Sequence, residues 1–186
     1  MGQAVRANIR GVLLDVDGTL YHQTPMRILM TAELLALPLR CGSWSDSVAT
    51  WKALRCFREV RENLRGLGRP AGALEYLQYQ ETARKLGCQP CDIRPLVEEW
   101  IHRRPLKYLE VCARRGVHDF FLFLADRGVR IGAFSDYPVH DKLQEMGLFK
   151  WVSVALCATD PDVNAFKPHN SGFKQACRLC GLDPAD

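Results

Sequence analysis

Two aspartates near the N-terminus are the residues of this sequence best placed to do chemistry. Asp15 and Asp17 follow residues 9–14, an apolar run rich in branched side chains that predicts a buried strand. Carboxylates at positions i and i+2 of an extended segment can point the same way, and Gly18 lets the backbone turn tightly directly after them. One such carboxylate can attack an electrophilic centre while the other transfers protons.

A hydroxyl and an amine follow two further apolar runs. Residues 129–134 and residues 151–156 also have the pattern of buried strands, and Ser135 directly follows the first of them. Lys167 lies beyond the second. Strands that alternate with helices form parallel sheets whose carboxyl ends share one edge, where ligands bind. We therefore expect a single cluster at this edge, formed by Asp15, Asp17, Ser135 and Lys167.

The elements that must position this cluster are a strand, a long helical stretch, and further strands separated by helices. Between Thr24 and Asp126 the apolar residues recur at helical spacing. Thr24-Pro25 has the pattern of a helix start, and Pro38 should end that first helix. Further helices are expected at about 45–65, 73–86 (ended by Gly87), 92–103 and 117–126. This order predicts an α/β fold with a parallel sheet and a helical insertion after the first strand.

Four arginines recur on one side of the helix predicted at 45–65, and they permit two interpretations. They are Arg55, Arg58, Arg61 and Arg65. Such a stripe could attract phosphate, but Glu59 and Glu62 lie among the arginines. We favour a solvated helix face whose charges balance.

The eight cysteines predict free thiols rather than a disulfide framework, because a chain of this length can build a core without covalent crosslinks. Two pairs, Cys88/Cys91 and Cys177/Cys180, have the CxxC spacing of zinc ligands. The pairs lie far apart in the sequence, so we favour small packing residues over a shared metal site.

Taken together, the motifs resemble those of the haloacid-dehalogenase-like (HAD) superfamily of hydrolases. Residues 15–21, DVDGTLY, match its first motif, residues 134–136, FSD, match the second, and residues 166–168, FKP, match the third. The helical insertion looks like the helical cap of the phosphoglycolate-phosphatase-like branch. The resemblance implies a Rossmann-like catalytic core of residues 1–22 and 116–186, with a helical cap domain of residues 23–115.

The same resemblance implies a role for each residue of the cluster. Asp15 would be the nucleophile that forms an aspartyl-phosphate, and Asp17 the general acid and base. Ser135 would bind the transferring phosphoryl group, and Lys167 would neutralise charge on nucleophile and phosphate. The implied cofactor is Mg²⁺, held by the Asp15 side chain and the Asp17 backbone carbonyl. An acid at Asp17 favours hydrolysis of phosphate esters over dehalogenation, since a departing halide needs no proton.

One departure from the family pattern leaves alternatives open. Family members continue into a further strand and an acidic fourth motif that supplies another magnesium ligand, whereas this sequence stops at Asp186. We expect the first strand to lack a neighbour on one side and magnesium binding to weaken. The first hypothesis is a magnesium-dependent phosphatase acting on a small phosphorylated metabolite. The alternatives are a sugar-phosphate mutase, and a catalytically incomplete domain that binds a phosphorylated ligand or a partner protein.

Composition excludes several other classes of protein. The formal charge is only +4, and basic residues are interspersed with acidic ones, so a nucleic-acid partner is not indicated. No apolar run is long enough to span a membrane, and the first residues lack the pattern of a secretory signal. We therefore expect a cytoplasmic protein without a membrane partner. The sequence indicates no particular oligomeric state.

Overall fold

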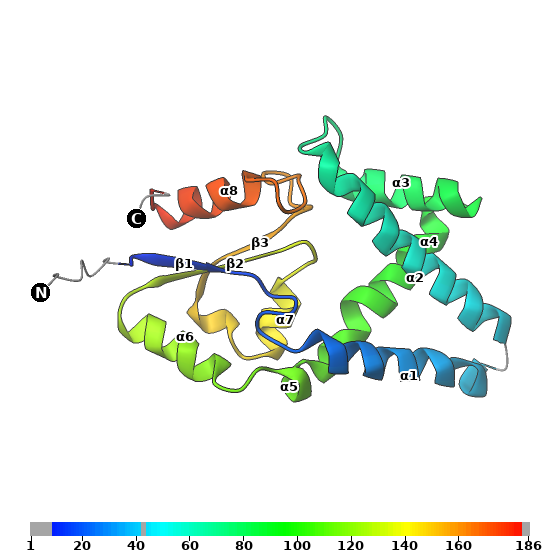
Figure 1. The fold of residues 1–186 in the computed structure, drawn as a ribbon, viewed down its shortest axis with the longest axis horizontal. Coiled ribbons are helices and arrows are strands. Elements are labelled where there is room, and N and C mark those ends of the chain that lie inside the picture. The colour runs from blue at the N-terminus through cyan, green and yellow to red at the C-terminus, as the bar shows by residue number, and fades with distance from the viewer. Residues whose placement is uncertain (1–8, 42–43, 184–186) are drawn as a thin grey trace, which may run out of the picture.

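A three-stranded parallel sheet forms the centre of one half of the molecule (Figure 1). The computed structural model describes residues 9–41 and 44–183. The strands are β1 (Gly11–Leu14), β2 (Arg130–Ser135) and β3 (Val152–Cys157), in the order β1-β2-β3. Leu14 pairs with Ala133, and Ala133 pairs with Ala155, so the carboxyl ends of all three strands lie at one edge. The predicted α/β fold class is confirmed.

Helices cover both faces of this sheet. α6 (Val117–Asp126) and α7 (His140–Glu145) lie on one face and α8 (Ser171–Cys180) on the other (Figure 1). The first face packs around the fully buried Phe121 and Leu143. On the other face α8 lies so close that a Cβ atom on Gly172 would be 2.1 Å from the Phe134 ring. Tight packing on both faces fixes where the strands end.

Strand β1 is shorter and less buried than its sequence predicts. The expected buried strand at residues 9–14 is a four-residue strand whose residues are all only partly buried. Its apolar pattern indicated burial on both faces. Within the part of the chain that the structure describes, however, β1 pairs with β2 alone and lies at the edge of the sheet.

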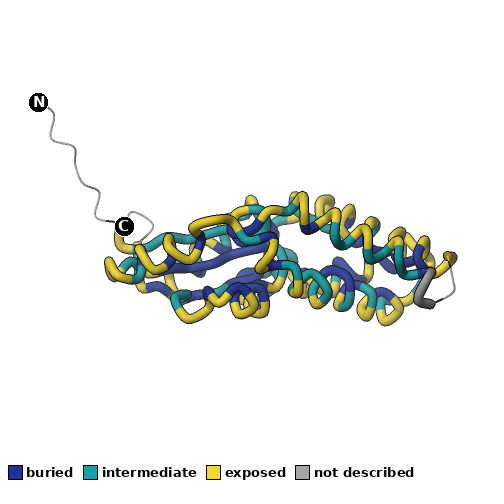
Figure 2. Tube along the Cα trace, turned by 90° about the horizontal axis from the view of Figure 1, so that it is seen from below, coloured by how far each residue is buried: buried dark blue, intermediate teal, exposed yellow. Residues whose placement is uncertain are grey.

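Most of the chain between β1 and β2 forms the second half of the molecule, a helical region of residues 23–112. Its elements are α1 (Gln23–Cys41), α2 (Trp44–Leu64), a 3₁₀ turn (Arg65–Leu67), α3 (Leu74–Leu86), α4 (Pro90–Val97), a π-helical segment (Glu98–Arg103), a 3₁₀ helix (Arg104–Tyr108) and α5 (Leu109–Cys112). These helices bury a core of their own, which includes Phe57, Tyr79 and Val97 (Figure 2). That they form a separate domain bounded at residues 22 and 116 stays a prediction.

Two helices of this region differ from their predicted bounds. α1 begins at Gln23 and continues through Pro38, although proline was expected to end it. Pro38 is buried, and the neighbouring Leu37 packs against the core of the helical region. This packing compensates for the hydrogen bond that a proline removes. α4 begins before Asp92 because the Asp92 carboxylate caps the Gln89 backbone N–H at 3.0 Å.

The two connections between the halves run side by side. The backbone N–H of His22 donates to the carbonyl of Cys112 at 2.8 Å, and that of Arg114 donates to the carbonyl of Leu20 at 3.0 Å. These bonds place the start of the helical region directly beside its end. The helical region therefore extends from the strand edge that carries the predicted cluster (Figure 1).

Candidate active site

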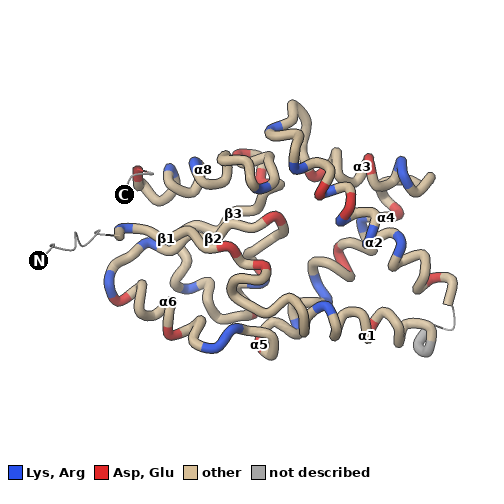
Figure 3. The backbone as a smooth tube through the Cα atoms, in the orientation of Figure 1, with Lys and Arg blue, Asp and Glu red and all other residues tan. Residues whose placement is uncertain are grey.

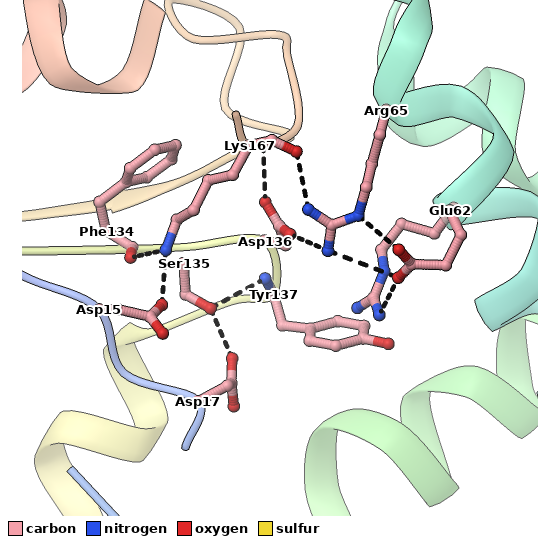
Figure 4. A network of polar contacts seen from close by, with 10 residues as sticks. Asp15, Asp17, Glu62, Arg65, Phe134, Ser135, Asp136, Tyr137 and Lys167 are labelled. Atoms are coloured by element: carbon pink, nitrogen blue, oxygen red, sulfur yellow. Dashed lines mark hydrogen bonds and ion pairs between the residues drawn. The ribbon is translucent and has the colours of Figure 1, made fainter. Parts of the chain in front are cut away.

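The structure brings the four predicted site residues together at the carboxyl edge of the sheet (Figure 4). The Lys167 Nζ atom lies 2.5 Å from Asp15 Oδ1, and the Ser135 hydroxyl donates to Asp17 Oδ2 at 2.5 Å. Asp15 and Asp17 leave β1, Ser135 ends β2, and Lys167 follows β3. The parallel register is the reason that residues so far apart in sequence meet at this edge.

The Asp15 carboxylate is the more accessible of the two. Its side chain is 41% exposed. Lys167 is held in place by a second bond, from its Nζ atom to the Phe134 carbonyl at 2.8 Å. Thr19 donates to the other Asp15 oxygen at 3.3 Å. An ammonium group on one oxygen and an open approach suit a carboxylate that attacks a negatively charged group.

The Asp17 carboxylate is enclosed by three donors. Besides Ser135, the Tyr21 hydroxyl donates to it, and the Lys142 Nζ atom lies 2.6 Å from Asp17 Oδ1. Burial by itself raises the pKa of Asp17, but Lys142 and the hydrogen bonds outweigh this, so the pKa is lowered overall. For Tyr21, burial and the neighbouring Asp17 raise the pKa well above its ordinary value. Asp17 is therefore ionised and Tyr21 neutral in this arrangement.

Sequence reasoning missed both Tyr21 and Lys142. Tyr21 lies inside the first motif but received no role. Lys142 is a lysine of α7 with only 5% of its surface exposed. Its position next to the apolar Leu143 is the one signal that the sequence offers, and burial of a lysine requires a paired anion.

The turn that carries both aspartates depends on a glycine. Gly18 has a φ angle of +90°, which disfavours side chains with a Cβ atom. Its carbonyl accepts a hydrogen bond from Arg114 Nη2 at 2.9 Å. A turn of this kind brings the chain back toward α1 directly after Asp17, as the first motif predicts.

A charged network joins the end of α2 to both strand-end loops (Figure 4). Arg65 pairs with Asp136 at 2.7 Å and donates to the Lys167 carbonyl at 2.7 Å. The other Asp136 oxygen accepts from the Lys167 backbone N–H at 3.1 Å. Glu62 holds the Arg65 Nε atom at 2.6 Å. The helical region is thus attached to the backbone of the site lysine.

The arginine stripe of α2 forms only part of the solvated, balanced face that the sequence favoured. Arg55 and Arg58 are exposed, and Glu62 pairs with Arg61 and Arg65. Only 12% of the Arg61 side chain is exposed, and its guanidinium lies over the Tyr137 ring. Glu59, expected to balance the stripe, pairs with Lys85 on α3 instead. The reason is that α2 turns this face toward the strand edge. Figure 3 shows basic positions along α2 and acidic positions at the strand ends that face the helical region.

Between the two halves lies a cavity of about 570 Å³. Asp17, Tyr21 and Lys142 contribute to its wall from the sheet half of the molecule. The opposite wall comes from α1, α2 and the segment around Trp100. A volume of this size holds a small molecule, and Asp17 is the one predicted site residue among those that line it.

The oxygen atoms at the site fit a magnesium ion. Asp15 offers an accessible carboxylate, and in the described part of the chain no hydrogen bond reaches the Asp17 backbone carbonyl. No group of three or more His, Cys, Asp or Glu residues among those described could form a closed metal cage. Mg²⁺ does not need one, since it commonly binds one or two carboxylates together with substrate phosphate and water. This also leaves each CxxC pair without a described metal site.

Comparison with known proteins identifies the class of enzyme. The family model of haloacid dehalogenase-like hydrolases matches residues 9–186. The chain therefore belongs to this family of hydrolases, as its motifs predict. No curated protein matches the sequence closely enough to suggest a particular relative.

Solved structures share the fold at low sequence identity. A dehalogenase superposes with a TM-score of 0.56 at 16% identity, covering 95% of this chain and 74% of that protein. The HAD-hydrolase YfnB from Bacillus subtilis bound to magnesium gives 0.56 at 14%, covering 92% and 74%. CbbY from Rhodobacter sphaeroides in complex with phosphate gives 0.55 at 18%, covering 95% and 74%. At these identities the likeness establishes the fold alone.

None of the helices among the described residues is long and apolar enough to cross a membrane.

Proposed function

We propose that this hydrolase is a magnesium-dependent phosphatase that acts on a small phosphorylated metabolite through an aspartyl-phosphate at Asp15. The observation that carries the proposal is the pairing of an accessible Asp15 carboxylate with Lys167, directly beside the enclosed Asp17 carboxylate. A halide leaving group needs no proton, whereas the alkoxide of a phosphate ester does. A second carboxylate at this position therefore favours phosphate esters.

In the first half of the reaction, an Asp15 oxygen forms a bond to phosphorus and the bond to the ester oxygen breaks. The leaving oxygen takes a proton from Asp17. Asp17 is ionised in the present arrangement, so it must first gain that proton. A phosphoryl group that takes over the Ser135 hydroxyl removes one bond that stabilises the ionised form, and its negative charge nearby favours protonation.

In the second half, Asp17 accepts a proton from a water molecule that attacks phosphorus, and the bond to Asp15 breaks. Lys167 offsets negative charge on Asp15 and on the phosphoryl group in both halves. Magnesium, held by the Asp15 carboxylate and the Asp17 carbonyl, would supply further neutralisation of phosphate charge.

The helical region is proposed to act as a cap that selects the substrate. It supplies one wall of the cavity, and the network through Arg65 attaches it to the Lys167 loop. Enclosure excludes bulk water until the aspartyl-phosphate has formed. A cavity of this size favours a small metabolite over a macromolecular phosphate ester.

The test is release of inorganic phosphate from a panel of small phosphate esters, with magnesium and with a chelator. We expect hydrolysis of a subset of the panel and its loss when magnesium is removed. Release of phosphate that is unaffected by chelation would contradict the metal requirement. Saturable binding of an ester without turnover would identify a binding domain, and isomerised product without free phosphate would identify a mutase.

A further inference from the structure

The first turn of α3 receives its hydrogen-bond cap from the other half of the molecule. The residue before the helix is Ala73, whose side chain cannot accept a hydrogen bond from the backbone N–H groups of the first turn. The backbone N–H of Leu74 instead donates to Oδ1 of Asn164 at 2.8 Å. Asn164 lies in the loop between β3 and Lys167, 90 residues farther along the chain. A residue of the sheet half therefore caps a helix of the helical region.

The amide group of Asn164 is also a donor in this contact. Its Nδ2 atom donates to the carbonyls of Pro70 at 3.1 Å and Gly72 at 3.0 Å. These carbonyls belong to the loop between α2 and α3, so a single side chain makes three hydrogen bonds to the helical region. An asparagine amide is suited to this contact because it offers both an acceptor and donors, whereas an aspartate would keep only the acceptor.

The backbone of Asn164 is held in an uncommon conformation. Among the described residues it is the one non-glycine residue with a positive φ angle, +46°. Its backbone N–H donates to the Asp160 carbonyl at 2.8 Å, and the neighbouring Ala165 N–H donates to the Ala158 carbonyl at 3.0 Å. A conformation of this kind persists where the surrounding structure determines it, and such positions are concentrated at functional sites. The loop thus presents the amide to the helical region in a fixed direction.

An apolar side chain reinforces the same contact. Leu74 is fully buried, and it packs into the core on the α8 face of the sheet together with Phe134 and Phe166. Arg69, in the loop between α2 and α3, donates to the Pro161 carbonyl at 3.3 Å. Figure 1 shows this loop next to the loop that precedes α8. The two halves are thus joined here by an inserted leucine and by hydrogen bonds between two loops.

This contact and the covalent connections between the halves lie at opposite sides of the molecule. The connections run beside α1 and α5, whereas the contact lies at the start of α3 (Figure 1). Rotation of the helical region about the connections must break the bonds to Asn164 and withdraw Leu74 from the sheet half. The contact at Asn164 therefore opposes any opening of the cavity that lies between the halves.

We propose that Asn164 is a latch that fastens the helical region to the sheet half in the ligand-free protein, and that its release opens the cavity beside Asp17. Asn164 is a positioning residue, because it acts on substrate binding through the helical region. A ligand that needs the closed cavity binds more tightly when the closed form is already populated, since less free energy is spent on closing.

The first experiment measures hydrogen exchange of backbone amides by mass spectrometry, on the full-length chain without ligand. It compares the wild type with Asn164→Gly, which accepts the positive φ angle but loses all of the side-chain hydrogen bonds. We expect amides in residues 68–76 to exchange about ten- to a hundredfold faster, and those in residues 158–166, across the contact, at least about threefold faster. Peptides from α4 and α6 should be unchanged.

The matched control is Asn170→Gly, because Asn170 is exposed, lies in the same connection to α8 and does not cap that helix through its side chain. It should leave exchange in both segments unchanged. If Asn164→Gly does not fold, Asn164→Asp replaces it: the donors are lost, so exchange in residues 68–76 should still rise. Unchanged exchange in both segments would overturn the proposal. Equal acceleration along the whole chain would overturn it too, because it would indicate a general loss of stability.

A second measurement concerns substrate, and this part rests on the proposed function. For an ester that the wild type hydrolyses, Asn164→Gly should raise KM about tenfold and leave kcat within about twofold, because bound substrate itself keeps the cavity closed. A lower kcat at unchanged KM would overturn the latch, since it would place the effect on the Lys167 loop. Unchanged kinetics with faster exchange would also overturn it, since the opening would not reach the cavity. If the wild type hydrolyses no ester, the proposed function fails, and hydrogen exchange alone decides on the latch.

Discussion

The two walls of the cavity differ in whether their cationic side chains are paired with carboxylates. At the strand edge each site cation is paired with a carboxylate; the pairs are Lys167 with Asp15, Lys142 with Asp17, and Arg65 with Asp136. On the helical wall, Arg27, Arg55 and Arg58 have no such partner among the described residues. The paired edge is nearly neutral, whereas the helical wall is positive.

The difference separates the chemistry from the choice of substrate. Paired charges at the strand edge are held in fixed positions before substrate arrives, so little reorganisation is needed during phosphoryl transfer. Cations on the helices that lack a carboxylate partner remain free to bind an anionic ligand. Under the proposed function, one fold can keep its reaction while the helical wall selects the substrate.

The largest effect is expected at the paired edge. Asp15→Asn should lower phosphatase turnover by about a thousandfold or more, because an amide neither attacks phosphorus nor binds the metal as a carboxylate does. Circular dichroism should show an unchanged fold. The matched control is Asp119→Asn, an exposed aspartate of α6. Retention of most activity by the Asp15 variant would show that another group is the nucleophile.

The next effect tests whether pairing holds the edge together. Lys142→Met should lower the free energy of unfolding by about 3 kcal/mol, because it leaves the buried Asp17 carboxylate without its cation. Adding Asp17→Asn removes both charges and should recover a large part of the loss. Urea unfolding of the two single variants and the double variant measures this coupling. Additive losses would mean that the two side chains act independently.

The paired edge was largely predictable from sequence, and the helical wall was not. Asp15, Ser135 and Lys167 each follow an apolar run, and the geometry of a parallel sheet requires the ends of such runs to meet. This argument needs only local patterns. The roles of the residues remain predictions, but their proximity follows from the fold.

The direction in which a helix face points, by contrast, depends on packing between distant segments. The spacing of Arg55, Arg58 and Arg61 is the same whether the face meets solvent or a cavity. Glu59 is near the arginines in sequence but pairs with Lys85 because α3 packs beside α2. Lys142 was not predicted as a site residue for the same reason, since its partner Asp17 is 125 residues away in sequence.

A smaller effect is expected where the two walls meet. Arg65→Lys keeps the positive charge but loses the planar group that contacts Asp136 and the Lys167 carbonyl together. We expect kcat to fall about tenfold with little change in the unfolding free energy, because Lys167 becomes less well positioned. Arg84→Lys, in a surface pair of α3, is the control. An unchanged kcat would show that the network does not contribute to the reaction.

The smallest effect lies farthest from the site, where Glu33 of α1 is bound by Arg104 at 3.0 Å and by Lys107 and Tyr108. Burial tends to raise the pKa of Glu33, but hydrogen bonds from Lys107, Tyr108 and Arg104 lower it to about 2. A carboxylate with a depressed pKa stabilises the fold fully above its unfolded pKa of about 4.3, and this contribution is lost as the pH falls toward the folded value.

Glu33→Gln should therefore cost about 1 kcal/mol at pH 7, a modest value because Lys107 is half exposed to solvent. The difference between variant and wild type should shrink between about pH 5 and pH 2 as the wild-type carboxylate becomes protonated. Thermal unfolding of both chains across this range measures it, and a difference that stays constant with pH would mean that Glu33 acts through packing rather than charge. Turnover should be unchanged at pH 7, since these contacts lie outside both walls of the cavity.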